Sequence, residues 1–400
     1  MVNRKIPKIR FRHFSDDWKS DKLGKLGTVA MNKRIFKEET SEVGEIPFYK
    51  IGSFGREPDS FITREKFEEY KSKYPYPEIG DILISASGSI GRTVEYLGEE
   101  AYFQDSNIVW LKHDERLDNS FLKQFYSIVK WQGIEGTTIK RLYNKNILET
   151  SIALPSISEQ SAIGSLFRTF DDLLASYKDN LANYRSLKTT MLSKMFPKAG
   201  QTVSEIRSDG FEGEWELLEI NDLADDFQSG GTPKTNVQEY WDGDIPWIQS
   251  SDLETNCLFE IKVQKSISEK GLKNSSAKII PKDSIAVVTR VGVGKLVVMR
   301  HEYATSQDFL SLSNLKSNIE FTAYLLYRLL QKEVTQLQGT SIKGITKVEL
   351  LSKKVLIPSL LEQQAIGSYF SNLDQLITSY QEKITQLETL KKKLLQDMFI

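Results

Sequence analysis

The sequence predicts a mixed α/β protein with two tandem domains, each followed by a long helix. The two helices are expected to pair as an antiparallel coiled coil with pseudo-two-fold symmetry. Three observations predict this: an internal duplication, a heptad pattern at the end of each copy, and short strand-like apolar runs between turn residues. We expect the first domain at residues 1–155, the first helix at 156–197, the second domain at 198–357 and the second helix at 358–400.

The duplication is the clearest of these observations. Residues 155–164 (PSISEQSAIG) return as residues 358–367 (PSLLEQQAIG), at an offset of 203. Upstream the offset falls to 197, where Phe14 and Trp18 match Phe211 and Trp215. Small loop insertions explain this drift, so the chain is read as two tandem copies of one unit.

Each tail is predicted to be one long helix. Ser156 with Glu159, and Ser359 with Glu362, fit a capping box at the helix start. Apolar residues then recur in alternating steps of four and three, which defines a coiled-coil seam. The seam residues are Ile163, Phe167, Phe170, Leu174, Tyr177, Leu181, Tyr184, Ile366, Phe370, Leu373, Ile377, Tyr380, Ile384 and Leu387. Lys188 and Lys391 interrupt both seams at the same place. The alternative is that each helix packs only on its own domain.

The globular parts contain short apolar runs of the kind that form strands. These runs are residues 81–85, 107–111, 284–288 and 295–298. Helices are expected near residues 121–131 and 322–338. Each domain is therefore predicted to hold one curved sheet with helices.

Composition excludes several classes of protein. The net charge of −1 argues against a protein that grips DNA by charge alone, although local clusters decide phosphate binding. Cys257 is the single cysteine, which excludes an internal disulfide framework and fits a reducing cytoplasm. The three histidines lie far apart in sequence and predict no metal site. No signal peptide is expected, and no apolar run reaches the roughly 20 residues of a membrane span.

Two stretches of the second copy resemble one known family. Residues 229–234 (SGGTPK) followed by 240–248 (YWDGDIPWI) are similar to the opening signature of a target-recognition domain in type I restriction–modification specificity subunits. Residues 267–272 (ISEKGL), 275–278 (SSAK) and the two tails fit the same family, so the resemblance spans the whole chain. The first domain departs from it, because residues 28–45 lack the Gly-Gly-Thr-Pro and Tyr-Trp signatures.

The resemblance implies a DNA-binding subunit that reads a bipartite, asymmetric target and carries no catalytic site or metal of its own. It implies two methyltransferase subunits that modify adenine, together with restriction subunits; S-adenosylmethionine, ATP and Mg would be bound by those partners. The predicted geometry agrees independently. Two antiparallel helices would hold their domains at opposite ends, so that each domain reads one half-site across a spacer of fixed length.

Candidate DNA contacts are polar or basic residues in loops, several of them at matching places in the two copies. In the first copy they are Lys33, Arg34, Tyr49, Lys50, Ser85, Ser87, Arg92, Thr138 and Lys140. In the second they are Thr232, Lys234, Thr235, Gln249, Ser250, Arg290, Lys295, Ser341 and Lys343. For any one of them, ordinary surface chemistry is an equal alternative.

Other interpretations remain open. Residues 88–91 and 292–295 superficially suggest nucleotide loops, but turn glycines fit them better. Asp59, Glu69 and Lys71 mimic a nuclease constellation that the second copy lacks. The basic residues 4–12 could be a DNA arm, a solvated tail or a segment that docks on the second helix. A coiled-coil adaptor that binds proteins instead of DNA is the main rival function.

Overall fold

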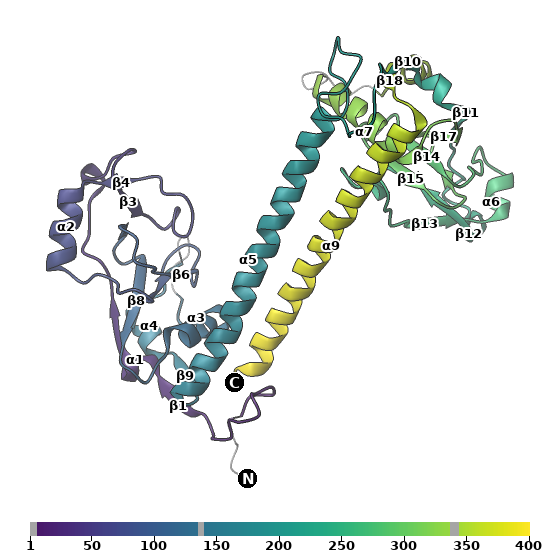
Figure 1. Ribbon diagram of the computed structural model, residues 1–400. Coiled ribbons are helices and arrows are strands. Elements are labelled where there is room, and N and C mark those ends of the chain that lie inside the picture. Colours follow the sequence, from purple (N-terminus) through teal and green to yellow (C-terminus); the bar gives the residue numbers. More distant parts are fainter. Residues whose placement is uncertain (1–5, 135–139, 337–343) are drawn as a thin grey trace. The chain divides into compact units, whose positions relative to one another are not determined.

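A computed structural model describes residues 6–134, 140–336 and 344–400 of the chain. It divides into two compact units (Figure 1). Unit 1 is Met1–Lys178 with Glu382–Ile400, and unit 2 is Asp179–Gln381. The long helices α5 (Ile157–Lys194) and α9 (Leu360–Met398) each contribute residues to both units. The domain boundaries expected at residues 155, 197 and 357 therefore stay predictions.

Unit 1 is built from short strands and four helices besides its parts of α5 and α9, within the residues described. Its strands are β1 (Lys19–Lys22), β2 (Gly27–Ala30), β3 (Ile46–Tyr49), β4 (Phe61–Ile62), β5 (Ile82–Ser85), β6 (Thr93–Glu95), β7 (Tyr102–Phe103), β8 (Ile108–His113) and β9 (Ser151–Leu154). Its helices are α1 (Leu23–Leu26), α2 (Arg64–Lys73), α3 (Asn119–Ile128) and α4 (Asn144–Glu149), with a 3-10 turn η1 at Lys37–Glu39. The helix α2 lies beside β3 and β4, where Phe67 packs with Phe48 and Ile62 (Figure 1).

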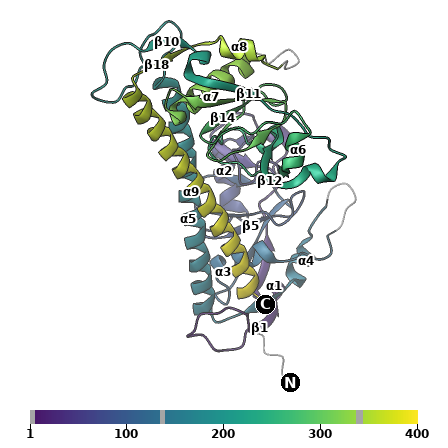
Figure 2. The same ribbon diagram turned by 90° about the vertical axis from the view of Figure 1, so that its right-hand side faces the viewer.

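Unit 2 follows the same order of elements. Its strands are β10 (Glu216–Glu219), β11 (Ala224–Ser229), β12 (Trp241–Ile248), β13 (Lys265–Ile267), β14 (Ser284–Val288), β15 (Leu296–Met299), β16 (Ala304–Thr305), β17 (Phe309–Leu315) and β18 (Lys354–Ile357). Its helices are α6 (Glu269–Lys273), α7 (Ile319–Gln336) and α8 (Lys347–Leu351), with 3-10 turns η2 (Ile220–Leu223), η3 (Gln238–Tyr240) and η4 (Ser250–Asp252). The helix α7 packs beside β14 and β15 (Figure 1), and Figure 2 shows it next to β14 from a second direction.

The sheets of the two units have the same topology. The larger sheets run β2-β8-β5-β6 and β11-β17-β14-β15, and the smaller ones β4-β3-β7 and β13-β12-β16. In both smaller sheets the central strand pairs in parallel with the last one. The pairs β1-β9 and β10-β18 complete each unit. The duplication and the mixed α/β class are thus confirmed, and the strands and helices expected from the sequence are present.

The expectation of one curved sheet in each domain is wrong. In unit 1 the strand β3 pairs with β4 at only two positions, Ile46 with Ile62 and Pro47 with Phe61. Its pairing with β7 also consists of only two residue pairs. Pro47 cannot donate to a ladder, and its counterpart Pro246 lies in β12. Among the described residues no strand of the smaller sheet pairs with a strand of the larger one, so each unit holds separate sheets.

The same aromatic arrangement anchors both cores. In unit 1 the ring of Phe121 stacks on Phe399 at 5.0 Å and meets Trp18 edge-on at 5.9 Å. In unit 2 Phe321 stacks on Phe196 at 5.5 Å and meets Trp215 at 6.0 Å. The residues after α5 and α9 therefore close equivalent cores, each under the first turn of α3 or α7.

The predicted capping boxes form only in part. The backbone N–H of Glu159 donates to Ser156 Oγ at 3.3 Å, as expected for a helix N-cap. The Glu159 carboxylate does not return to the helix start. It accepts two hydrogen bonds from Arg10, at 2.6 and 2.7 Å, and is fully buried. A carboxylate with a bidentate partner elsewhere is unavailable for the second half of a capping box.

The equivalent residues of unit 2 also form only the serine half of the capping box. The Ser359 hydroxyl accepts from the backbone N–H of Glu362, while the Glu362 carboxylate accepts two hydrogen bonds of 2.7 Å from Arg207. The hydrogen bond to Glu362 raises the pKa of Arg207. Each glutamic acid thus ties the segment before the first strand of its unit to the start of the long helix.

The glutamine that follows each of these glutamic acids bonds to the N-terminus of a second helix, α3 in unit 1 and α7 in unit 2. Gln160 accepts from the backbone N–H of Asp118 at 2.9 Å, and Gln363 accepts from that of Asn318 at 2.9 Å. Asp118 is the N-cap of α3, and Asn318 caps the first turn of α7 by accepting from the N–H of Phe321. The glutamine of each Glu-Gln pair therefore connects the start of the long helix, α5 or α9, to the start of α3 or α7.

A glycine in each long helix allows this close approach. A Cβ on Gly164 would lie 1.8 Å from Ser120 Oγ and 3.0 Å from its backbone carbonyl carbon. A Cβ on Gly367 would lie 2.6 Å from Asn318 Oδ1 and 2.9 Å from the backbone N of Phe321. Any larger side chain would push α3 or α7 away from the long helix.

The two long helices pair antiparallel within each unit, which confirms the predicted coiled coil. In unit 1 Lys178 pairs with Glu388 at 2.7 Å. In unit 2 Arg185 donates to Gln381 at 2.9 Å, and the rings of Tyr184 and Tyr380 lie 5.3 Å apart. All fourteen predicted seam residues are buried or half-buried.

Lysines fill the two breaks in the seam with equivalent ion pairs. Lys188 pairs with Asp374 at 2.5 Å in unit 2, and its side chain is only 10% exposed. Lys391 pairs with Asp171 in unit 1. In unit 2 the hydroxyl of Tyr324 also donates to Asp374, at 2.7 Å, and burial raises its pKa. The interruptions are therefore charged contacts between the two helices.

The basic N-terminal segment docks on the end of α9 in unit 1. The backbone N–H of Ile9 donates to the carbonyl of Asp397 at 2.9 Å, and Lys8 approaches the Asp397 carboxylate at 3.5 Å. Arg10 makes the buried pair with Glu159. Of the three interpretations offered for this segment, docking on the second helix holds for Lys8 and Ile9, while Arg10 pairs with the first helix; residues 1–5 lie outside the described residues.

Candidate nucleic-acid interface

Each unit carries a cavity at the end of its larger sheet. In unit 2 the cavity measures about 900 Å³ and lies among the ends of β11 and β14, the start of β17 and the segment before α8. In unit 1 it measures about 440 Å³ and lies among residues 34–38, residues 104–107 and Arg141. Two sides of the cavities correspond: residues 104–107 match the start of β17, and Arg141 matches the segment before α8. Residues 289–293 also line the unit 2 cavity, whereas their counterparts, the described residues 86–90, are not part of the unit 1 lining.

Strand pairing fixes which residues correspond across the two cavities. In unit 1 the N–H of Ala86 donates to Asn107 O at 2.7 Å, and the N–H of Leu142 donates to Ala86 O at 2.8 Å. In unit 2 Thr289 donates to Asp308 O at 2.7 Å and accepts from Ile345 at 2.8 Å. Ala86 therefore corresponds to Thr289, and Leu142 to Ile345.

The two cavities differ in the side chains at the neighbouring positions. By the same register Ser87 corresponds to Arg290, and Arg141 corresponds to Gly344. Each unit thus has one arginine and one small residue at this pair of positions, but on opposite segments. In unit 1 Ser87 and Arg141 form an isolated antiparallel bridge, so the two segments are direct neighbours.

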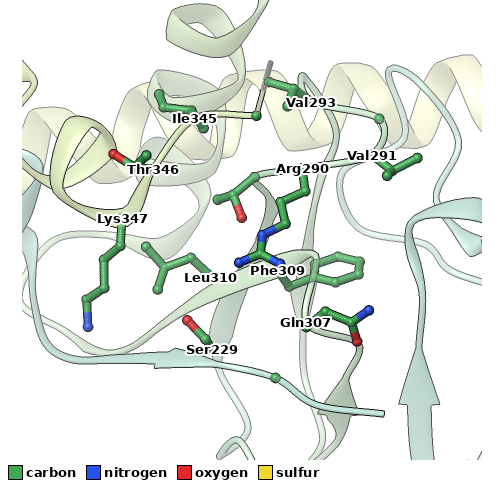
Figure 3. A pocket seen from close by; sticks show the side chains of 14 residues that line it. Ser229, Arg290, Val291, Val293, Gln307, Phe309, Leu310, Ile345, Thr346 and Lys347 are labelled. Atoms are coloured by element: carbon green, nitrogen blue, oxygen red, sulfur yellow. The ribbon is translucent and has the colours of Figure 1, made fainter. Parts of the chain in front are cut away.

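Arg290 occupies the middle of the unit 2 cavity. Figure 3 shows its guanidinium directed into the cavity, among Phe309, Leu310 and Ser229. Within the part of the chain that the structure describes, it has no hydrogen bond or ion pair. Lys347 lies on the other side of the cavity and donates one hydrogen bond, to the Phe227 carbonyl at 3.1 Å. Among the described residues that line it there is no carboxylate, so the cavity suits an anionic or acceptor-rich ligand.

Arg34, Lys37 and Arg141 give the unit 1 cavity its positive charge, beside Glu38 and Asp105. The guanidinium of Arg34 lies 5.0 Å from the ring of Phe36. Arg141 is exposed and has no partner among the described residues. Of the residues predicted from the sequence, Arg34 and Arg290 are therefore the ones that line these two cavities.

Three predicted contacts of unit 1 lie outside its cavity. The Lys33 amine lies 5.3 Å from the ring of Tyr74, and Lys50 pairs with Asp59 at 3.2 Å. Tyr49 stacks on Phe103 at 5.8 Å, and burial raises its pKa. Their role in DNA binding stays a prediction.

Four further predicted contacts lie in or beside the glycine-containing turn at residues 85–92. The Ser85 hydroxyl donates to the Ser89 carbonyl and accepts from the Arg92 N–H, so the turn itself uses it. Ser87 is buried and donates to Asn107 Oδ1 at 2.6 Å, and Arg92 donates to the Phe54 carbonyl at 2.9 Å. Lys140 is exposed.

The predicted contacts of unit 2 also include residues that are bonded within the fold and residues that are exposed. The Thr232 hydroxyl donates to Gln307 Oε1 at 2.6 Å, while Lys234 and Thr235 are exposed. Lys295 donates to the carbonyls of Ser250 and Leu253, at 3.4 and 2.7 Å, so its charge serves the fold. Gln249 is bonded to Asp252 through both its backbone and its side chain. Thr138, Ser341 and Lys343 lie outside the described residues.

Sequence reasoning missed Arg141, Lys347 and two glutamines, Gln104 and Gln307, that also line the cavities. In the sequence Gln104-Asp105 recurs as Gln307-Asp308, and this repeat was a signal for the glutamines. Gln104 Oε1 accepts from the backbone N–H of Ile51 at 3.2 Å, and Gln307 Oε1 accepts from Thr232. Their side-chain amide nitrogens donate to no group among the described residues.

The structure does not bring the suggested nuclease residues together. Asp59 pairs with Lys50, Glu69 pairs with Lys73, and Lys71 lies over the rings of Phe67 and Tyr76. The glycines at 88, 91, 292 and 294 all have positive φ, as turn glycines do. Across the described ranges, no helix combines the length and the apolar character that a membrane crossing requires.

Comparison with known proteins identifies the fold and the family. A family model described as the type I restriction modification DNA specificity domain matches residues 15–183 and 212–389. A crystal structure of the type I restriction–modification S subunit from M. genitalium is similar over 99% of both chains, with a TM-score of 0.64 at 17% identity.

Two relatives illustrate the range of similarity in sequence. A putative type I restriction enzyme specificity subunit of Haemophilus influenzae is 54% identical over 160 residues, which is 40% of this chain and 42% of that one. This chain therefore spans less than half the length of that relative in the alignment. A putative specificity subunit of Methanocaldococcus jannaschii, MjaX, is 23% identical over 97% of this chain and 94% of its own length.

Proposed function

Because the chain belongs to the family of type I restriction modification DNA specificity domains, we propose that it is the DNA-reading subunit of a type I restriction–modification complex. It binds a bipartite, asymmetric DNA target. It positions methyltransferase and restriction subunits for adenine methylation or cleavage. The two units read one half-site each.

One observation carries the proposal of two different half-sites. Both units have the same topology and place a cationic cavity beside two corresponding chain segments, the one before β8 or β17 and the one at Arg141 or Gly344, yet the charged residues stand at different positions. A common fold with different side chains suits two readers of different sequences, because base edges are distinguished by the side chains that meet them.

The reaction chemistry belongs to partner subunits in this proposal. Two methyltransferase subunits would bind S-adenosylmethionine, and the restriction subunits would use ATP and Mg. This chain supplies binding and orientation, which fits the separate positions of Asp59 and Glu69. The pairing of α5 with α9 would connect the two readers.

The test is a map of methylated adenines in the host genome, with the gene intact and with it deleted. We expect deletion to abolish methylation at one asymmetric, two-part motif. Replacing residues 1–150 with the matching domain of another family member should change one half of the motif and leave the other half unchanged.

Two outcomes would contradict the proposal. If deletion leaves every methylated motif intact while the matching methyltransferase is active, the chain does not determine specificity. If domain replacement changes both halves of the motif, the units do not read independently. The first outcome would favour a protein-binding adaptor.

A further inference from the structure

The two units carry an arginine beside the cavity at positions that do not correspond, although the surrounding fold is the same. At the paired positions 87 and 141 of unit 1 the residues are serine and arginine; at 290 and 344 of unit 2 they are arginine and glycine. The main-chain bonds of Ala86 and Thr289 establish this correspondence independently of sequence alignment.

Neither arginine is needed by the fold. Arg141 and Arg290 are exposed, and neither has a hydrogen bond or an ion pair with any residue in the described ranges. Other arginines of the chain are used structurally: Arg10 and Arg207 pair with buried carboxylates, and Arg92 bonds a carbonyl. A free guanidinium presents a planar set of donors, which matches the two acceptors on the major-groove edge of guanine.

The change of place distinguishes a base contact from a backbone contact. Phosphates follow the same path past both half-sites, so a phosphate contact required by both units would be expected at corresponding positions. A base contact has to move when the target sequence differs between half-sites. The arginines occupy positions that do not correspond, as expected for base contacts.

The neighbouring glutamines are less suited to this role. Reading adenine requires both the carbonyl and the amino group of a glutamine. Gln104 has its carbonyl held by the backbone N–H of Ile51, and Gln307 has its carbonyl held by Thr232. Each keeps a single donor group for the ligand, which suits a phosphate oxygen.

From these contacts we propose that Arg141 and Arg290 are specificity-determining residues, each reading one guanine in its own half-site. The inference rests on the proposed function of the chain. Because the two side chains extend from different segments, the guanines occupy different places within the two half-sites.

The experiment uses the whole methyltransferase complex and two substitutions at each position. Arg141→Ala and Arg290→Ala should each relax the motif at one guanine, in opposite halves. Binding to the intact target should weaken by about 1–3 kcal/mol, or roughly five- to 150-fold, as for the loss of a bidentate base contact. The motif is read by sequencing methylated DNA, and affinity from duplexes substituted at each position.

The lysine variants separate base reading from charge. Arg290→Lys and Arg141→Lys keep a positive charge but lose the planar donor pair. They should relax the motif as the alanine variants do, while the salt dependence of binding stays near that of the native protein. Lys347→Ala is the contrast, because loss of a phosphate contact weakens all targets alike and lowers the salt slope by about one.

Three results are decisive. If alanine variants bind all targets equally weakly and lysine restores binding, the arginines contact phosphate and the inference is overturned. If neither the motif nor the affinity changes, they contact no DNA and it is likewise overturned. If native protein determines no motif at all, the proposed function itself fails, which the gene deletion reveals separately. Thermal unfolding of each variant, with Gln386→Ala as an exposed control, checks that the fold is intact.

Discussion

At the residue scale, the two buried Arg–Glu pairs are contacts that the local sequence pattern did not predict. Glu159 and Glu362 stand where a capping box places an acidic residue, and the local pattern predicts that role. Their partners lie 149 and 155 residues away in the chain. A local motif cannot reveal a bond to so distant a residue, whereas the serine caps, which are local, were predicted correctly.

Removing one member of such a pair should be costly. Glu362→Gln leaves Arg207, whose side chain is 18% exposed, without its charge partner. We expect a loss of about 3–5 kcal/mol in unfolding free energy, because an uncompensated charge stays buried. Thermal or urea unfolding, followed by hydrogen exchange at β10 and β18, measures it.

A matched control is available in the exposed pair Lys178–Glu388, with side chains 55% and 51% exposed. Glu388→Gln should cost no more than about 1 kcal/mol, since solvent screens exposed ion pairs. Equal effects of the two substitutions would show that burial does not govern the strength of the Arg207–Glu362 pair.

At the element scale, the long helices were the most predictable part of the fold. Heptad spacing depends on neighbours along one helix, so it can be read directly from sequence. The cavities could not be predicted in this way, because each is formed by chain segments separated by strands and loops. Arg290 was identified as a basic residue in a loop, but Arg141 had no matching residue in the second copy to draw attention to it.

The glycines at the crossing of helices offer a test at this scale. Gly164→Ala and Gly367→Ala should each destabilise the protein by about 1–3 kcal/mol, because a Cβ overlaps the first turn of α3 or α7. Calorimetry measures the change. Gly52→Ala is the control, since nothing lies within 4 Å of a Cβ there. A neutral effect at 164 and 367 would mean that the helices separate at little cost.

At the scale of the whole molecule, unit 1 includes the last residues of the chain. Leu395 and Met398 are buried in its core, and Phe399 stacks on Phe121. The C-terminal end of α9 is therefore part of the first domain's interior, and the N-terminal segment bonds to it at Asp397.

Deleting residues 395–400 should unfold unit 1 selectively. The deletion removes buried apolar side chains worth about 1.5–3 kcal/mol each and opens the core around Trp18. Hydrogen exchange should become fast in β2, β5 and β8 while β14 and β17 stay protected. Ile400→Ala, at a position 57% exposed, is the control. Uniform protection after the deletion would contradict this.

This arrangement also sets an order for folding on the ribosome. All the residues of unit 2 emerge before the last ones that unit 1 requires, although unit 1 begins the chain. At bacterial and eukaryotic synthesis rates the 222 residues between Lys178 and Ile400 take on the order of ten to forty seconds. During that interval the nascent first domain holds an open apolar face around Trp18 and Phe121. Unit 2 is thus the first that can be completed, and residues 395–399, which are made after it, close the core of unit 1.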